Sequence, residues 1–185
     1  MDNGASSYRR YLDGDDNGLS EIVRDYKDGL ILFLNQFVNN FCVAEELTED
    51  TFFRLITKKP KFFGKSSFKS WLYAIGRNVA VDYIRHNSKL MNTPIEEMDN
   101  YISDGKCLQE AYITEENKKT LHSTLAKLAP DYRRVLWLVY FEDFSNREVA
   151  VIMKKNDRQI KNLLYRAKKS LKAELDKEGF IYENL

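Results

Sequence analysis

Residues 62–85 combine aromatic rings with cations, and this combination is suited to unpaired nucleic-acid bases. The segment 68–86 has helical spacing, which predicts that Tyr73 and Arg77 share one face of a helix. Rings stack on unpaired bases while cations follow the phosphate backbone, and the preceding loop is suited to a base that has left the stack. The candidate residues for single-stranded DNA are Phe62, Phe63, Lys65, Ser66, Ser67, Tyr73, Arg77, Asn78 and Arg85.

The opposite sector of the same helix is apolar and contains Trp71, so we assign it to the core of the protein. The tryptophan ring is therefore expected to pack inside the protein rather than on a base. The basic face has a plainer interpretation as well, because a block of like charges is often only a solvated helix face.

A second candidate site lies between Ser145 and Lys172, where the pattern is that of a helix-turn-helix. Ser145 and Glu148 have the spacing of a capping box, and Asn156 is placed to cap the next helix. That second helix has an apolar side and a basic polar side, as a helix in a DNA major groove requires. Arginine can form two hydrogen bonds to the edge of guanine, asparagine can form two to adenine, and lysine contacts phosphate. The candidates are Arg158, Lys161, Asn162, Tyr165, Arg166 and Lys169.

An ordinary basic amphipathic helix in a small bundle would also produce this second pattern. The distribution of charge favours the nucleic-acid interpretation, because the net charge of +1 conceals a strong segregation. Residues 50–90 carry 9 basic and 2 acidic side chains, and residues 119–185 carry 14 and 9. Both basic blocks coincide with the two motifs.

Acidic side chains gather on a third helix, expected over residues 43–57, with Phe53 among them. An aromatic ring surrounded by charge is typical of a protein-binding hot spot, and the acids would favour a partner with a basic surface. The candidate contact residues are Glu46, Glu49, Asp50 and Phe53. A solvated face is again the alternative.

Other kinds of site have little support in the sequence. Cys42 and Cys107 lack the spacing of a disulfide framework or a zinc site, and His86 and His122 are isolated. We therefore expect no metal, no cofactor, no small-molecule substrate and no catalytic residue. The apolar runs are too short to span a membrane, and the N-terminus lacks an export signal, so we expect a cytoplasmic protein without membrane insertion.

The fold class expected from the long helical periodicities is all-α, with two small helical domains joined by a flexible acidic linker. We place the domains at 1–88 and 115–185 and the linker at 89–114. Fully extended, such a linker reaches about 90 Å at about 3.3 Å per residue, or roughly 25 base pairs at about 3.4 Å each. The expected helices cover residues 8–12, 43–57, 68–86, 115–128, 131–142, 146–153 and 157–175.

Three segments together resemble a bacterial RNA polymerase sigma factor of the extracytoplasmic-function (ECF) class. They are Ala44-Glu-Glu-Leu-Thr-Glu-Asp-Thr-Phe-Phe53, Phe68-Lys-Ser-Trp-Leu-Tyr-Ala-Ile-Gly-Arg-Asn78, and the region from Leu128 to Ala167. The tryptophan-centred segment is the most specific of the three, because many regulators contain a helix-turn-helix. The likeness extends over nearly the whole chain.

The resemblance implies a sigma-2-like domain and a sigma-4-like domain in a non-enzymatic promoter-specificity subunit. The first domain would bind the clamp helices of core RNA polymerase through the acidic helix. It would also melt and read the −10 element with residues of the first motif. The second would contact the polymerase flap and read the −35 element with the basic helix. The resemblance also implies an anti-sigma factor as a partner.

The chain departs from the family pattern at several positions. Lys154 and Lys155 stand where the family usually has glycine and an apolar residue, and glycine accepts positive φ more readily than lysine does. Leu163 stands where arginine is common, and Phe63 and Lys65 replace other loop residues. Two other function classes remain open: a dimeric helix-turn-helix repressor or activator on palindromic duplex DNA, and a helical nuclease, which would need clustered metal ligands.

Overall fold

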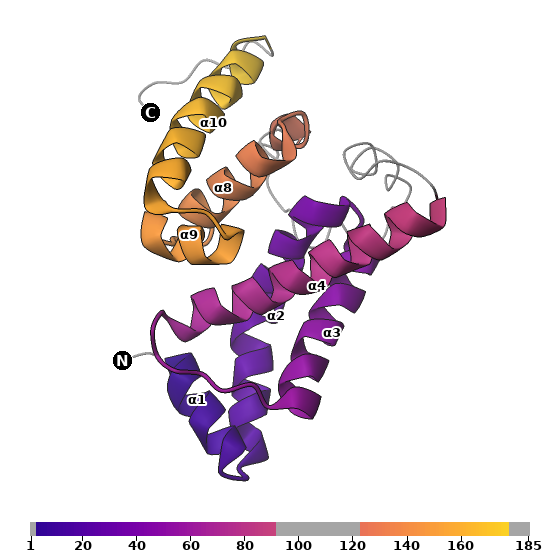
Figure 1. Cartoon of the computed structure of the whole chain (residues 1–185), viewed down its shortest axis with the longest axis vertical. Helices are drawn as coiled ribbons and strands as arrows, with labels where there is room; N and C mark the ends of the chain where they lie inside the picture. The colour runs from indigo at the N-terminus through magenta and orange to yellow at the C-terminus, as the bar shows by residue number, and fades with distance from the viewer. Residues whose placement is uncertain (1–2, 92–122, 178–185) are drawn as a thin grey trace.

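The computed structural model describes residues 3–91 and 123–177, and the regular structure in these ranges is helical throughout. The N-terminal module contains α1 (Asn3–Leu12), α2 (Asp16–Val38), α3 (Phe41–Lys58) and α4 (Phe68–Met91). The C-terminal module contains α8 (Pro130–Tyr140), α9 (Asn146–Met153) and α10 (Asp157–Lys177). Figure 1 shows α4 crossing α2 and α3, with α9 lying against α4 from the other side. The expected all-α class is confirmed.

The helices begin where short polar side chains satisfy the first free backbone amides. Asp15 caps α2, Asn40 caps α3, and Ser145 forms a complete capping box with Glu148 at the start of α9. Asn156 accepts a hydrogen bond from the backbone amide of Gln159 at 2.8 Å, just before α10. The capping box and the Asn156 cap are both as the sequence predicts.

Helix bounds differ from the expected ones mainly at the ends. The helix expected over 8–12 begins earlier, at Asn3, and α4 continues past the expected end at residue 86 to Met91. It therefore includes residues 89–91, which we expected to belong to the linker. The rest of that linker, and most of the helix expected over 115–128, lies outside the described residues. In the described ranges, no helix is long and apolar enough to cross a membrane.

Aromatic rings hold α1 and the loop before α4 against α4 itself. The ring of Trp71 lies 5.4 Å from that of Tyr8, 5.2 Å from that of Phe62 and 5.4 Å from that of Phe68. Tyr8 also donates a hydrogen bond to the carbonyl of Pro60 at 2.8 Å. Trp71 is therefore a packing residue, as the sequence predicts, and its cluster fixes the position of the loop.

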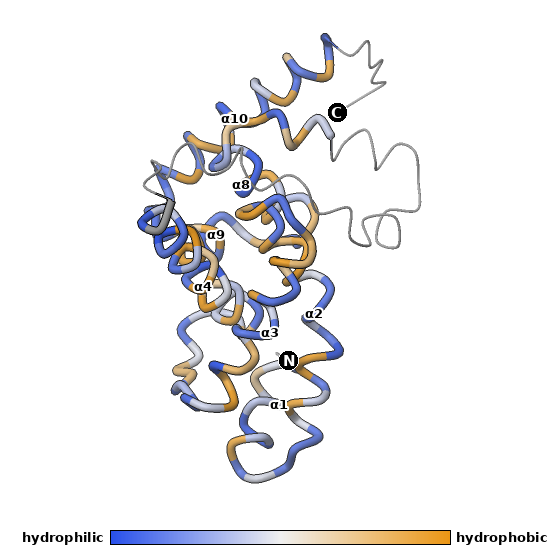
Figure 2. Tube along the Cα trace, turned by 90° about the vertical axis from the view of Figure 1, so that its right-hand side faces the viewer, coloured by the Kyte–Doolittle hydropathy of each residue, from blue (hydrophilic) through white to orange (hydrophobic). Residues whose placement is uncertain are grey.

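The C-terminal module is a helix-turn-helix, α9 and α10, supported by α8. Its buried residues include Val149 and Ile152 of α9, with Ile160 and Ala167 of α10. Figure 2 shows orange, apolar stretches where α2, α4 and α9 meet, whereas the tube of α10 is mostly blue with orange at intervals. This is the pattern of an amphipathic helix with one side on the module and the other in solvent.

Candidate nucleic-acid interface

The polar face of α10 is open to solvent over its length. Exposure reaches 72% for Tyr165, while Ile160 and Ala167 on the other side are fully buried. All six residues predicted for duplex DNA are exposed: Arg158, Lys161, Asn162, Tyr165, Arg166 and Lys169. Their accessibility is as expected, and their contact with DNA stays a prediction.

A shallow hollow of about 230 Å³ lies along the first three turns of this face, with Leu163 as its apolar wall. Gln159 stands at its rim and is held there, because its amide oxygen accepts a hydrogen bond from the backbone of Asn156 at 2.8 Å. Asn162 and Arg166 also line the hollow. Both offer donors to a base edge, and both are spaced for one face of the helix.

The turn between α9 and α10 contains a strained lysine. Lys154 has φ 53° and ψ 45° and closes α9 by donating its backbone N–H to the carbonyls of Ala150 and Val151. This left-handed conformation costs a residue with a Cβ roughly 1–2 kcal/mol. A lysine therefore closes the turn of this helix-turn-helix in a left-handed conformation, at some cost in stability.

The loop before α4 has one strongly exposed aromatic residue. Phe63 is 75% exposed, whereas Phe62 is half-buried with its ring edge-on to Phe68 at 5.6 Å. Both line a cavity of about 240 Å³ whose opposite wall is α1, with Arg9 and Leu12. The combination of an exposed ring, an apolar wall and a guanidinium suits an unstacked nucleotide.

Sequence reasoning missed the contribution of α1 to this cavity. Arg9 and Leu12 precede the loop by about fifty residues, and Leu12 is 40% exposed although it is apolar. The sequence contains no local signal that α1 and this loop would meet. Lys65 is exposed, and Ser66 and Ser67 are half-buried.

The predicted open face of α4 is covered in this structure, which corrects the sequence-based expectation. Tyr73 is 1% exposed and Ser70 is fully buried. Both modules cover Tyr73: its ring stacks on Phe33 of α2 at 5.1 Å, and its hydroxyl donates a hydrogen bond to Glu142 of the C-terminal module at 2.7 Å. Ser67 likewise donates a hydrogen bond to Glu148 of that module. Burial and the negative charge of Glu142 together raise the pKa of Tyr73 well above its usual value. Contact of these residues with DNA stays a prediction.

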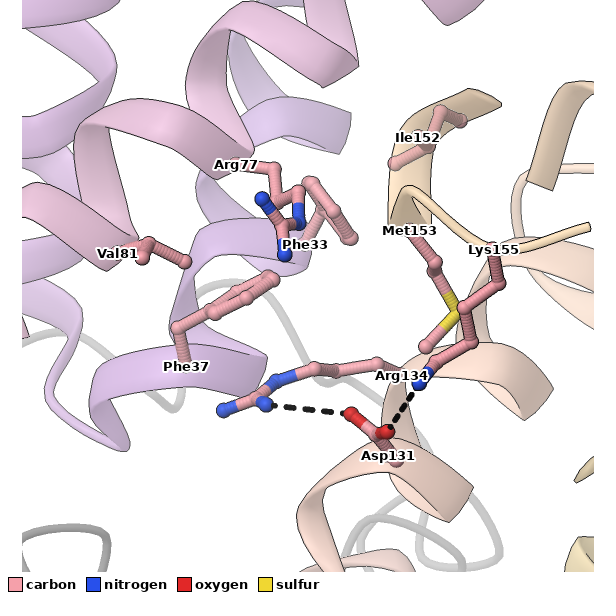
Figure 3. Close-up of a pocket in the computed structure, with 9 residues that line it drawn as sticks. All are labelled: Phe33, Phe37, Arg77, Val81, Asp131, Arg134, Ile152, Met153 and Lys155. Atoms are coloured by element: carbon pink, nitrogen blue, oxygen red, sulfur yellow. Dashed lines mark ion pairs between the residues drawn. The ribbon is translucent and has the colours of Figure 1, made fainter. Parts of the chain in front are cut away.

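Arg77 lies in a cavity of about 230 Å³ between the two modules (Figure 3). Phe33 and Phe37 form part of its apolar lining. Across it, Asp131 pairs with Arg134 at 3.7 Å and with Lys155 at 3.1 Å. Burial lowers the pKa of Arg77 from its usual value, because desolvation disfavours the charged guanidinium.

The two remaining predicted −10 residues on α4 differ in their surroundings. Asn78 is half-buried and accepts a hydrogen bond from Arg77 at 3.4 Å. Arg85 is exposed.

The acidic face of α3 is exposed as predicted. Glu46, Glu49 and Asp50 are all open to solvent, and Phe53 among them is 61% exposed. Ile56, 42% exposed, continues the same face by one turn and was not singled out by sequence reasoning. Among residues 3–91 and 123–177, no three or more histidine, cysteine or acidic side chains are grouped to hold a metal ion.

Two family models match the chain, one for sigma-70 region 2 over residues 22–90 and one for sigma-70 region 4 over residues 118–171. The chain belongs to the sigma-70 family. In this sigma factor, the region 2 match contains α3 and most of α2 and α4. The region 4 match contains α8, α9 and most of α10. All the DNA-contact residues predicted from the sequence therefore fall inside the matched regions.

The sigma factor is also similar to curated relatives over most of its length. It is 26% identical over 162 residues to the RNA polymerase sigma factor YlaC of Bacillus subtilis, and the matched segment covers 87% of this chain and 94% of YlaC. It is 25% identical over 170 residues to the ECF sigma factor SigW of the same organism, and the matched segment covers 88% of this chain and 91% of SigW. These relatives place the sigma factor in the ECF class, whose members direct RNA polymerase to promoters in transcription initiation.

Two solved structures share its fold. The sigma factor RpoE from Bartonella quintana, determined with the anti-sigma factor NepR, matches with a TM-score of 0.70 at 22% identity, over 85% of this chain and 96% of that one. CnrH, determined with the cytosolic domain of CnrY, matches with a TM-score of 0.64 at 20% identity, over 94% of this chain and 95% of CnrH.

Proposed function

We propose that this sigma factor places α10 in the major groove of the −35 element and holds unpaired −10 bases with the loop 62–67 and α4. The observation that carries the proposal is the presence of two chemically different exposed surfaces in one chain. One is the basic face of α10, and the other is Phe63 beside Arg9. The first suits paired bases in a groove, and the second suits a base outside the stack.

In this proposal residues 1–88 form the module that binds core polymerase and the −10 element. Residues 115–185 form the −35 module, which also contacts the flap. Residues 89–114 tether the two. The DNA-contacting positions on the first module are those predicted from the sequence, with Arg9 and Leu12 of α1 added as the far wall of the base cavity.

Core polymerase is bound through the acidic face of α3, with Phe53 and Ile56 as apolar anchors. An exposed aromatic ring surrounded by Glu46, Glu49 and Asp50 is well matched to a basic helical partner such as the clamp helices. The acids also repel phosphate, so this face and the DNA surfaces serve different partners.

Promoter melting in this scheme needs no catalytic residue and no cofactor. Separating a base step costs a few kcal/mol, and binding of the exposed base in the loop cavity offsets that cost. The protein acts in the cytoplasm, where the polymerase and the promoter are. By likeness to RpoE and CnrH, whose structures contain partner chains, we extend the proposal to an anti-sigma factor that holds this chain in check.

Transcription in vitro over a library of random promoters, with core polymerase and with or without this chain, tests the function directly. We expect transcripts that depend on the chain and share two sequence elements separated by a spacer. Transcripts that lack an upstream element would overturn the role of α10. A chain that binds palindromic duplexes as a stable dimer and leaves polymerase unchanged would favour a repressor or activator instead.

A further inference from the structure

The side chain of Gln159 is held by a reciprocal pair of hydrogen bonds at the start of α10. Its backbone N–H donates to the side-chain oxygen of Asn156 at 2.8 Å, and its own amide oxygen accepts the backbone N–H of Asn156 at 2.8 Å. A backbone N–H can only donate, so the atom of Gln159 that faces it is the oxygen and not the nitrogen. The cap therefore directs the oxygen back at the turn.

The amide NH₂ group is the part of Gln159 that remains for a partner. The residue is exposed, and its NH₂ group makes no hydrogen bond to any residue in the ranges 3–91 and 123–177. An unrestrained glutamine binds adenine with its oxygen and its nitrogen together. Gln159 would have to give up its cap to do so. It is therefore suited to a base edge that only accepts, such as O4 of thymine or O6 and N7 of guanine.

Leu163, one turn further along α10, decides between these two bases. It is half-buried against the core and forms the apolar wall of the hollow that Gln159 also lines. Thymine presents a C5 methyl group beside the O4 acceptor in the major groove, whereas guanine presents acceptors without a methyl group. Cytosine has no methyl group and would bring its N4 donor against the NH₂ group of Gln159. An apolar wall beside a donor therefore matches thymine.

The cations around the hollow leave it open to a base. Lys155 lines it, but its ammonium is held by Asp131 at 3.1 Å. Lys161 and Lys168 lie on the other flank of α10, because residues of a helix advance by about 100° each. Lysines on that flank are suited to phosphates, and the hollow is the flank that is suited to base edges.

We propose that this hollow selects a thymine in the −35 element: the NH₂ group of Gln159 donates to O4, and the C5 methyl group contacts Leu163. The assignment rests on the proposed placement of α10 in the major groove and adds the base that this part of the helix recognises. The cap already holds the Gln159 side chain, so binding costs little further loss of rotamer freedom. Asn162 and Arg166 are left for neighbouring base pairs.

Uracil in place of thymine tests the methyl contact. A randomised −35 element is first selected by transcription with core polymerase and the full chain, and each selected thymine is then replaced by uracil, which removes only the methyl group. We expect one position at which uracil lowers the apparent affinity by about threefold to fivefold, the effect of one buried methyl group. In Leu163→Ala the same replacement should have no effect. Each chain is compared with itself on two templates, so a loss of stability does not alter this ratio. A uracil effect of equal size in both chains, or none at any position, would overturn the contact.

Gln159→Glu tests the donor. Glutamate keeps the oxygen that the cap requires and replaces the NH₂ group with a second acceptor, so thermal melting should give the same stability as the parent chain. At the uracil-sensitive position the parent should prefer thymine over cytosine by about tenfold or more, and Gln159→Glu should prefer cytosine, whose N4 group donates. Ala173→Glu is the matched control, because it adds the same charge at an exposed position of α10 and should keep the thymine. A Gln159→Glu chain that still selects thymine refutes the role of Gln159.

The base assignment and the proposed function fail in different ways. A chain that directs no promoter-dependent transcription with core polymerase overturns the proposed function and the base assignment together. A chain that transcribes from a selected −35 element, but whose choice of bases changes neither with uracil nor in Gln159→Glu, overturns the base assignment alone.

Discussion

Arg134 of α8 lies over the ring of Phe37 of α2, with 4.0 Å between the guanidinium carbon and the ring centre. Its Nε also donates a hydrogen bond to the carbonyl of Gln36 at 3.3 Å, and Arg133 donates one to the same carbonyl at 2.9 Å. Gln36 lies in the last turn of α2, where helix carbonyls lack a partner in their own helix. The C-terminal module thus completes the end of a helix in the N-terminal one.

Replacing Arg134 with alanine should lower the free energy of unfolding of the whole chain by about 1–2 kcal/mol. The variant loses a cation–π contact and a hydrogen bond to a helix terminus. Urea denaturation measures the change. Arg147→Ala, at an exposed arginine of α9, is the control and should have little effect. Equal stability of the two variants would mean that the contact with Phe37 contributes nothing.

Lys154→Gly should stabilise the protein by about 0.5–1 kcal/mol. Glycine removes the cost of the left-handed backbone, and part of that gain is lost to its greater freedom in the unfolded chain. Lys154→Ala keeps the strain and should leave stability nearly unchanged, which separates backbone strain from loss of the lysine charge. Thermal melting measures both, and a destabilised glycine variant would contradict the prediction.

Phe53→Ala should weaken binding to core polymerase by about tenfold or more, as expected for an aromatic anchor worth about 1.4 kcal/mol or more. Ile56→Ala should have a smaller effect in the same direction. Surface-immobilised core polymerase gives the affinities. Leu12→Ala trims another exposed apolar side chain and should bind core normally. Unchanged affinity of the Phe53 variant would remove this face from the interface.

Arg166→Ala should cost roughly 1–3 kcal/mol in promoter binding and relax the preference at one −35 position, because a fork onto a base edge would be lost. Lys168 lies on the same helix with its ammonium 5.3 Å from the centre of the Tyr140 ring, so Lys168→Ala should weaken all sequences alike, if at all. Selection from a randomised −35 element compares the variants. An unaltered selected sequence would count against the contact.

Acid should weaken the contribution of Glu148 to stability. Burial alone would raise the pKa of Glu148, but hydrogen bonds from Ser67 and Ser145 outweigh it and hold the pKa below its usual 4.5. A carboxyl group whose pKa is lower in the folded state than in the unfolded state stabilises the folded state at pH values above its unfolded pKa. This stabilisation disappears as the pH falls through the folded pKa.

The pH effect is measured as the difference in unfolding free energy between the parent chain and Glu148→Gln, from about pH 6 down to about pH 3. The parent chain should be more stable at pH 6, and its advantage should shrink below about pH 4.5. Glu46→Gln, at an exposed carboxyl of α3, is the control and measures the pH dependence that results from removing a carboxyl group that is open to solvent. A difference that stays constant over this range would refute the linkage.

Local chemistry was enough to predict much of this molecule from its sequence. The caps at Ser145 and Asn156, the basic exposed face of α10 and the packing role of Trp71 follow from neighbours within a turn or two of helix. The exposure of Phe53 among acids follows in the same way, because helical periodicity reports which side of a helix meets the core of its own module.

Only the tertiary structure shows that Tyr73 is buried and that Arg9 lies beside Phe63. Helical periodicity distinguishes an apolar side from a polar side. It does not distinguish a polar side that faces water from one that packs against a second polar surface, because both have the same sequence pattern. Glu142 lies 69 residues from Tyr73, and the hydrogen bond between them depends on how the two modules pack together. The spacing of residues within a helix contains no information about how the two modules pack together.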